Sequence, residues 1–159
     1  MTEFEPAAGA PIEPGYRFSR THAFDEEQVR RFALAAGDDN PLHHDAEFAR
    51  GTRFGGLIAS GTHTTSLLMG LTASHFAKKG NVLGINFSVD LLRPVRASET
   101  VLIEWNVLSI AARPRGGSII EMQGWVKDAD DRTSVLAHGT VLLAPSSSSQ
   151  LPRTGSQAG

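Results

Sequence analysis

The pattern of hydrophobic and polar positions along the chain is first helical and then alternating. From Glu26 to Ala36 the apolar side chains recur every three or four residues, which predicts an amphipathic helix. Asp25, with Gln28 three residues later, predicts its start, and Gly37 predicts its end. A second helical segment, from Gly61 to about Lys79, is apolar around most of its circumference. We therefore expect this second helix to be buried.

Beyond Asn81 the apolar residues alternate with polar ones, which is the period of β-strands. The candidate strands are Val82–Leu92, Glu99–Ile110, Ser118–Asp128 and Thr133–Leu143, with an earlier strand at Tyr16–Phe24. One buried helix followed by long antiparallel strands predicts a single α+β domain, in which an antiparallel β-sheet wraps around a long central α-helix. We place this domain at residues 15–145. A flexible N-terminal arm at 1–14 precedes it, and a disordered Ser-rich tail at 146–159 follows it.

A polar segment, Gly37–Asp45, separates the first helix from the segments that follow. Asn40 precedes a proline, which pushes its backbone toward extended geometry and stiffens the segment. Asp38 and His43 lie five residues apart within it, and a carboxylate and an imidazole held in this way can form an acid/base pair. The same residue types also form good turns, so a plain helix-to-helix turn is the alternative interpretation.

The stretch Phe32–His43, which reads FALAAGDDNPLH, resembles the signature of the MaoC-like dehydratases and (R)-specific enoyl-CoA hydratases (hydratase 2). That signature has an aromatic residue, an apolar spacer and then Gly-Asp-x-Asn-Pro-apolar-His. Ala36 departs from it mildly, because the family often has Ser or Thr there. The resemblance covers about residues 16–144. It implies the hot-dog fold, with two chains whose sheets join and with an active site near the dimer interface.

The same resemblance implies a reaction, the addition of water to a trans-2-enoyl thioester or its reversal. Asp38 would be the general base, and His43 would hold the same water and help to transfer its proton. A positioned acid/base group typically contributes ~10²–10⁴-fold to the rate. Asn40 would orient this dyad, or would only form the turn. Asp39 and His44 match variable positions of the family, and we expect them at the surface.

The enolate oxygen of such a reaction needs hydrogen-bond donors. Ser60 is the predicted N-cap of the buried helix and Gly61 its first residue, so free N–H groups and the positive end of the helix dipole lie there. Gly61 would let the thioester approach closely, while Ser60 replaces the histidine of the family's His-Gly step. Ser66 matches a serine that lines the family's pocket, or it bonds within its own helix. We expect His63 to be a core or interface histidine.

Composition and charge limit the kinds of molecule that the protein is expected to bind. The net charge is −2, which gives no argument for nucleic acid or an anionic membrane, and no apolar run reaches the ~20 residues of a membrane span. The chain has no cysteine and no metal-binding histidine spacing, so we expect no metal. We expect no cofactor beyond the CoA or acyl-carrier thioester that carries the substrate. The N-terminus lacks a secretory pattern, and we expect a cytoplasmic protein. Candidate cations for carrier phosphates are Arg50, Arg53, Lys78, Lys79, Arg93 and Arg96.

We therefore predict a hydratase/dehydratase of fatty acid metabolism that acts on enoyl-CoA and forms a homodimer or a higher homo-oligomer. One alternative is an acyl-CoA thioesterase on the same fold, with Asp38 activating water against the carbonyl. Another is a non-catalytic acyl-thioester-binding subunit paired with a second hot-dog chain. The pattern leaves open the acyl length and branching, the choice between CoA and carrier protein, and the direction of the reaction.

Overall fold

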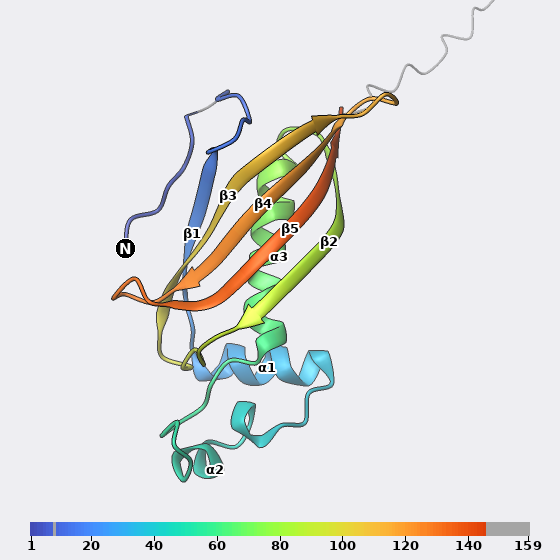
Figure 1. The fold of residues 1–159 in the computed structure, drawn as a ribbon. Coiled ribbons are helices and arrows are strands. Elements are labelled where there is room, and N and C mark those ends of the chain that lie inside the picture. The colour runs from blue at the N-terminus through green and yellow to red at the C-terminus, as the bar shows by residue number, and fades with distance from the viewer. Residues whose placement is uncertain (8, 146–159) are drawn as a thin grey trace, which may run out of the picture.

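The computed structural model describes residues 1–7 and 9–145, so the Ser-rich tail predicted at 146–159 lies outside the described residues. A five-stranded antiparallel sheet curves around one long helix, as the sequence pattern predicts (Figure 1). The strands are β1 (Arg17–Ala23), β2 (Asn81–Leu91), β3 (Thr100–Ala112), β4 (Ser118–Lys127) and β5 (Thr133–Ala144). Their order in the sheet is β1-β3-β4-β5-β2, which makes β1 and β2 the two edges.

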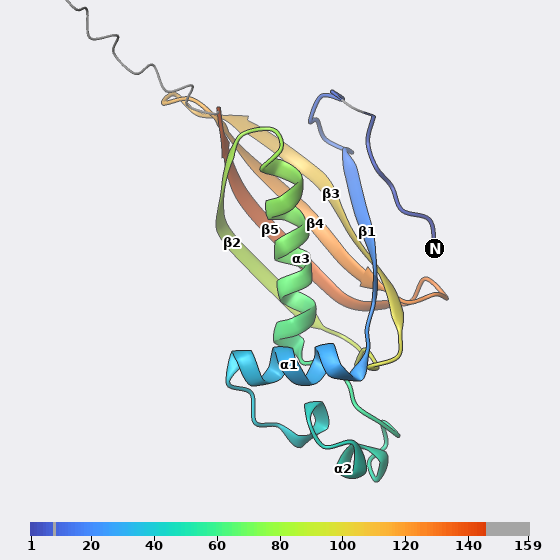
Figure 2. The ribbon, with the colours of Figure 1, turned by 180° about the vertical axis from the view of Figure 1, so that it is seen from behind.

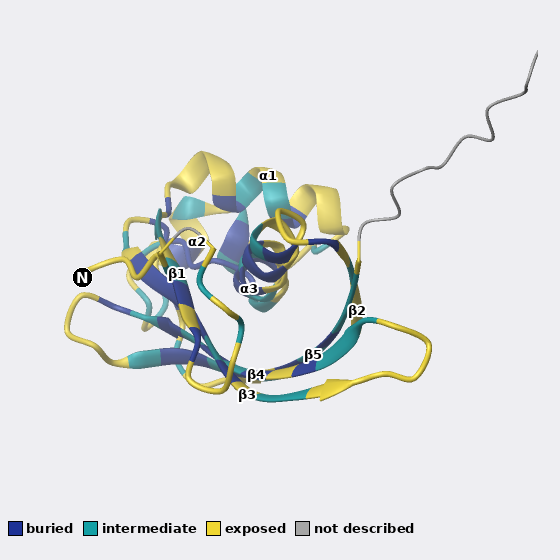
Figure 3. Cartoon of the chain, turned by 90° about the horizontal axis from the view of Figure 1, so that it is seen from above, coloured by how far each residue is buried: buried dark blue, intermediate teal, exposed yellow. Residues whose placement is uncertain are grey.

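The long helix α3 (Gly61–Phe76) lies in the concave face of the sheet (Figures 2 and 3). The ring of Trp105 in β3 is fully buried between them, and its Nε1–H donates to the Leu68 carbonyl at 3.0 Å. Gly124 lies opposite in β4, where an added Cβ would come within 2.6 Å of the Trp105 ring. Only glycine leaves room for this ring, so the central packing depends on both residues.

One side of α3 departs from the expectation that this helix is buried all round. Met69 is 41% exposed, and Ser66, Gly70 and Ala73 are also exposed. The sheet packs on the side of the helix that carries residues such as Leu68, whereas none of the described residues buries the side that carries Ser66 and Met69. The helix also ends at Phe76 rather than near Lys79, and the turn that follows it leads directly into β2.

The two edges of the sheet have different surroundings. The backbone N–H of Ser19 in β1 donates to the Phe4 carbonyl at 2.9 Å, so part of the N-terminal arm contacts this edge. At the other edge, β2 exposes Leu83, Ile85 and Leu91 by 64%, 55% and 60%. A strand edge without a partner readily pairs with another chain, the more so where apolar side chains are exposed along it.

Three short elements lie at the end of the sheet where α3 begins (Figure 1). They are the helix α1 (Glu26–Ala36), the 3-10 turn η1 (Pro41–His43) and the helix α2 (Ala46–Arg50). The predicted caps of α1 are confirmed: Asp25 accepts from the Gln28 N–H at 2.8 Å, and Gly37 ends the helix with φ 69°. Among the described residues, no helix is long and apolar enough to cross a membrane.

Candidate active site

The segment after α1 holds Asp38 and His43 by hydrogen bonds within the turn. The Asp38 N–H donates to the Ala33 carbonyl at 2.9 Å, which attaches Asp38 to the last turn of α1. The Asn40 N–H donates to Asp38 Oδ1 at 3.1 Å, and Asn40 Oδ1 accepts from the Leu42 N–H at 3.1 Å. Asn40 therefore fixes the Asp38 carboxylate on one side and caps the 3-10 turn that carries His43 on the other.

The side chains of Asp38 and His43 face each other. Asp38 Oδ2 lies 3.6 Å from His43 Nε2, which is longer than a direct hydrogen bond. The His43 ring is buried, and its Nδ1 lies 2.7 Å from the Ile58 carbonyl. Because a carbonyl can only accept, the proton of the neutral ring is assigned to Nδ1, and Nε2 is left as an acceptor directed at Asp38. Two acceptors at this separation can share one water molecule, which donates one proton to each.

A cavity of about 310 Å³ adjoins His43 and reaches the start of α3. Gly61, Thr64 and Leu91 are among the residues that line it. The Ser60 hydroxyl caps α3 and accepts from the His63 N–H at 3.2 Å. Ser60 thus takes up the His63 N–H, but the N–H of Gly61, the first residue of α3, has no partner within the helix and can bind an oxygen atom in this cavity.

The side chain of Leu91 lies directly against Gly61. A Cβ added to Gly61 would come within 2.3 Å of a Leu91 methyl group, so this close approach requires glycine. Leu91 is 60% exposed and ends the edge strand β2, so no buried packing holds its side chain in place.

The structure brings some of the predicted site residues together. His43 and Gly61 line one cavity. Asp38, which is held by Asn40, does not line this cavity but lies next to His43. Ser60 caps α3, as predicted, and its side chain is also buried. Ser66 lies on the exposed side of α3, outside the lining of this cavity.

Two contacts at the site were not evident from the sequence. His44, expected at the surface, is half-buried, and its Nε2 hydrogen-bonds to the Asp38 carbonyl. The Ile58 carbonyl sets the tautomer of His43 from another loop, and no sequence signal marks it because every residue has a carbonyl. Asp39 is exposed, as expected. Among residues 1–7 and 9–145, no cluster of three or more His, Asp or Glu could hold a metal ion.

His63 lies on the far side of the start of α3, in the core, as expected. Its ring stacks on Phe32 of α1, with centroids 4.2 Å apart and an interplanar angle of 1°. Burial lowers the pKa of His63 below its ordinary value, and the nearby His22 lowers it further. The ring is therefore neutral near pH 7 and packs as an aromatic side chain that joins α1 to α3.

Comparison with known proteins places the chain in a family. The family model described as "MaoC like domain" matches residues 7–123. The 3-hydroxyacyl-thioester dehydratase Z of Mycobacterium tuberculosis is 27% identical over 149 residues, covering 87% of this chain and 99% of that protein. The (R)-specific enoyl-CoA hydratase of Aeromonas caviae is 33% identical over 100 residues, covering 62% of this chain and 73% of that protein.

Solved structures agree with this placement. The (R)-hydratase of A. caviae, described as involved in PHA biosynthesis, superposes with a TM-score of 0.74 at 27% identity, covering 83% of this chain and 97% of that chain. A 3R-hydroxyacyl-ACP dehydratase complex of M. tuberculosis has the same fold, with a TM-score of 0.70 at 20% identity, covering 83% of this chain and 98% of that chain. The sheet wrapped around α3 is thus the hot-dog fold, and the chain belongs to the MaoC-like domain family of hydratases and dehydratases.

Proposed function

We propose that this protein adds water to trans-2-enoyl thioesters to give (R)-3-hydroxyacyl thioesters, and catalyses the reverse dehydration. The observation that carries the proposal is the position of Asp38 and His43, whose acceptor atoms lie 3.6 Å apart with the His43 tautomer set by Ile58. Similarity to the A. caviae (R)-hydratase supports the stereochemistry and the enoyl-CoA substrate. The carrier would be CoA or an acyl-carrier protein, and no other cofactor is proposed.

In the proposed reaction, one water forms two hydrogen bonds, donating one O–H to Asp38 Oδ2 and the other to His43 Nε2. Its oxygen lone pairs are then free to attack the β-carbon of the substrate. As the C–O bond forms, the water proton passes to Asp38, and the π electrons of the alkene move toward the thioester oxygen. The enolate is then protonated at the α-carbon by the dyad, which restores the Asp38 carboxylate.

The start of α3 is the proposed site for the enolate oxygen. Gly61, at the positive end of the helix dipole, lines the cavity that His43 also lines. One hydrogen-bond donor to such an oxygen is worth about 2.7–4 kcal/mol of barrier in well-studied hydrolases, which is comparable to the acid/base contribution. We propose that Ser60 acts by holding this helix end, and that Ser66 acts only where an acyl chain runs along α3.

A second cavity, of about 270 Å³, is the proposed site for the acyl chain. It lies further along α3 and is lined by Met69, Gly70, Thr72, Ala73, Val82, Gly84, Phe87 and Val141. Met69 is eight residues beyond Gly61, which is about 12 Å along a helix. A mostly apolar lining at this distance from the reacting carbons suits a hydrocarbon chain.

Two arginines are proposed to bind the carrier. Arg53 and Arg93 line the same cavity as His43. Asp128 holds the Arg93 guanidinium at 3.0 Å, whereas Arg53 forms no ion pair among the described residues. A free guanidinium at the cavity suits the phosphate groups of a CoA or carrier-protein arm.

We further propose that the active unit is a homodimer or a higher homo-oligomer. The uncovered side of α3 and the open edge of β2, with its exposed leucine and isoleucine side chains, support this proposal, because a second copy placed there would bury both. The relevant measurement is the native mass in solution. A cytoplasmic location stays a prediction from the composition.

The experiment that tests the function follows absorbance at the enoyl-thioester band across a series of acyl-CoAs. Loss of this band with crotonyl-CoA, without release of free CoA, is the expected result. Release of free CoA from a saturated acyl-CoA would instead indicate a thioesterase. An inactive homodimer that still binds acyl-CoA would indicate a non-catalytic subunit.

A further inference from the structure

The outer edge of β1 is occupied by the N-terminal arm of the same chain. Ser19 and Thr21 are two residues apart in β1, so their N–H groups point out from the same edge, away from β3. The Ser19 N–H donates to the Phe4 carbonyl at 2.9 Å, and the Thr21 N–H donates to the Glu3 carboxylate at 2.6 Å. The Phe4 N–H in turn donates to the Ser19 hydroxyl. Two consecutive outward donors of this edge are thereby used within the chain.

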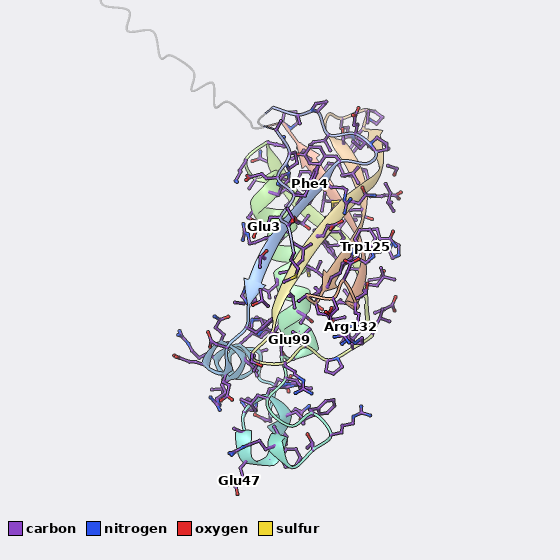
Figure 4. The ribbon with its side chains drawn as sticks, turned by 90° about the vertical axis from the view of Figure 1, so that its left-hand side faces the viewer. Glu3, Phe4, Glu47, Glu99, Trp125 and Arg132 are labelled. Carbon is purple, nitrogen blue, oxygen red and sulfur yellow. The ribbon has the colours of Figure 1, made fainter. Side chains whose placement is uncertain are left out.

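Side chains reinforce these backbone contacts. The Arg17 guanidinium lies over the Phe4 ring, 5.9 Å from its centroid, and Arg17 Nε donates to the buried Glu104 carboxylate at 3.0 Å. The hydrogen bonds from Thr21 lower the pKa of Glu3, so its carboxylate is fully ionised near neutral pH. Figure 4 shows Glu3 and Phe4 alongside β1.

The opposite edge has no comparable cover. Among the described residues, the backbone of β2 forms hydrogen bonds with β5 only. Its outer edge has no contact like the one between the N-terminal arm and β1. Apolar side chains, Leu83 and Ile85 among them, are exposed there beside polar ones such as Ser88 and Asp90. A sheet with two free edges could add copies in three ways. Pairing of β2 with β2, or of β1 with β1, closes a two-fold dimer, whereas pairing of β1 with β2 continues without limit.

We propose that the N-terminal arm, by binding the outer edge of β1, prevents a strand of another chain from pairing there, so that a second copy of this chain joins through β2 alone. The arm satisfies the donors that an incoming strand would use, and the Phe4 ring lies where the side chains of that strand would pack. The assembly therefore closes at β2 instead of growing as a chain of sheets. This proposal is independent of the catalytic activity.

The test compares the full chain with a deletion of residues 2–5 and with two matched point variants. Glu3→Ala removes the acceptor of the Thr21 N–H, whereas Glu5→Ala removes a carboxylate of the same arm for which the structure gives no hydrogen bond. Hydrogen exchange at the Ser19 and Thr21 amides reports whether the edge is occupied. Native mass over a range of protein concentrations reports the assembly, and thermal unfolding shows that each variant is folded.

The expected result is exchange at both amides that is roughly fivefold or more faster in the deletion, at about 1 kcal/mol for each lost hydrogen bond. Species larger than those of the full chain should then grow with concentration. Glu3→Ala should release Thr21 more than Ser19, and Glu5→Ala should match the full chain. Unchanged exchange in the deletion would show that the arm does not occupy this edge. Faster exchange without larger species would show that the arm does not limit assembly.

Discussion

The proposed pair Asp38 and His43 allows a quantitative prediction of how much activity is lost when one or both residues are replaced. Their facing atoms are 3.6 Å apart, which is too long for a direct hydrogen bond but suitable for one shared water. If they act on the same water, removing either one already removes most of the activation. The losses from Asp38→Asn and His43→Ala should then not multiply.

The magnitude follows from the typical contribution of one acid/base group. Each single variant should lose about 10²–10⁴-fold in kcat for crotonyl-CoA hydration, which is about 3–5 kcal/mol of barrier. Two independent groups would lose about 10⁴–10⁸-fold together. We expect the double variant instead to stay within about tenfold of the worse single variant, since groups that act as one unit are strongly non-additive.

The assay is the absorbance of the enoyl thioester under saturating substrate, with thermal unfolding measured for each variant. Asp39→Asn is the matched control, because Asp39 is the exposed neighbour of Asp38 and should retain wild-type activity. Multiplicative losses in the double variant would refute the shared water. Wild-type activity in Asp38→Asn would refute the dyad itself.

Three further predictions concern packing, pH and carrier binding. Gly124→Ala should lower stability by about 1–3 kcal/mol in thermal unfolding, because its Cβ would lie 2.6 Å from the buried Trp105 ring. Burial, and then the nearby lysines, lower the pKa of His75 to about 4, so the unfolded state takes up its proton first as the pH falls. The free energy of unfolding should therefore fall by roughly 1–2 kcal/mol, after solvent screening, as the pH drops from 6.5 toward 4. Chemical unfolding at pH 7 and pH 4.5 measures this fall, which should be smaller in His75→Leu. Arg53→Gln should raise KM for crotonyl-CoA but not for the phosphate-free crotonyl N-acetylcysteamine thioester, and an equal rise for both would exclude phosphate binding.

Local chemistry in the sequence was enough to place the elements. Asp25 and Gly37 bound α1 as predicted, since a carboxylate cap and a left-handed glycine act within one turn of the chain. The strand boundaries likewise agree to within a few residues, because alternation of apolar side chains is a local signal. The family signature likewise lies within one segment, so Asp38 and His43 could be named before the fold was known.

Other features depend on residues that are distant in sequence. The tautomer of His43 is set by the Ile58 carbonyl, and the space beside Gly61 is filled by Leu91 of an edge strand. His44, whose position in the sequence favoured the surface, hydrogen-bonds to Asp38. These contacts involve backbone carbonyls or close packing between distant segments, which do not depend on a particular residue type. The sequence pattern therefore could not have predicted them.

The sequence by itself therefore determined the main helices, the strands and their wrapping around one central helix, and it named Asp38 and His43 as the proposed acid/base pair. Only the tertiary structure decided which side of α3 lies uncovered and which sheet edge is open, because both depend on how much surface the single sheet can cover. It also decided that the N-terminal arm contacts β1, since Glu3 and Phe4 meet their partners only once β1 lies at the edge of the sheet.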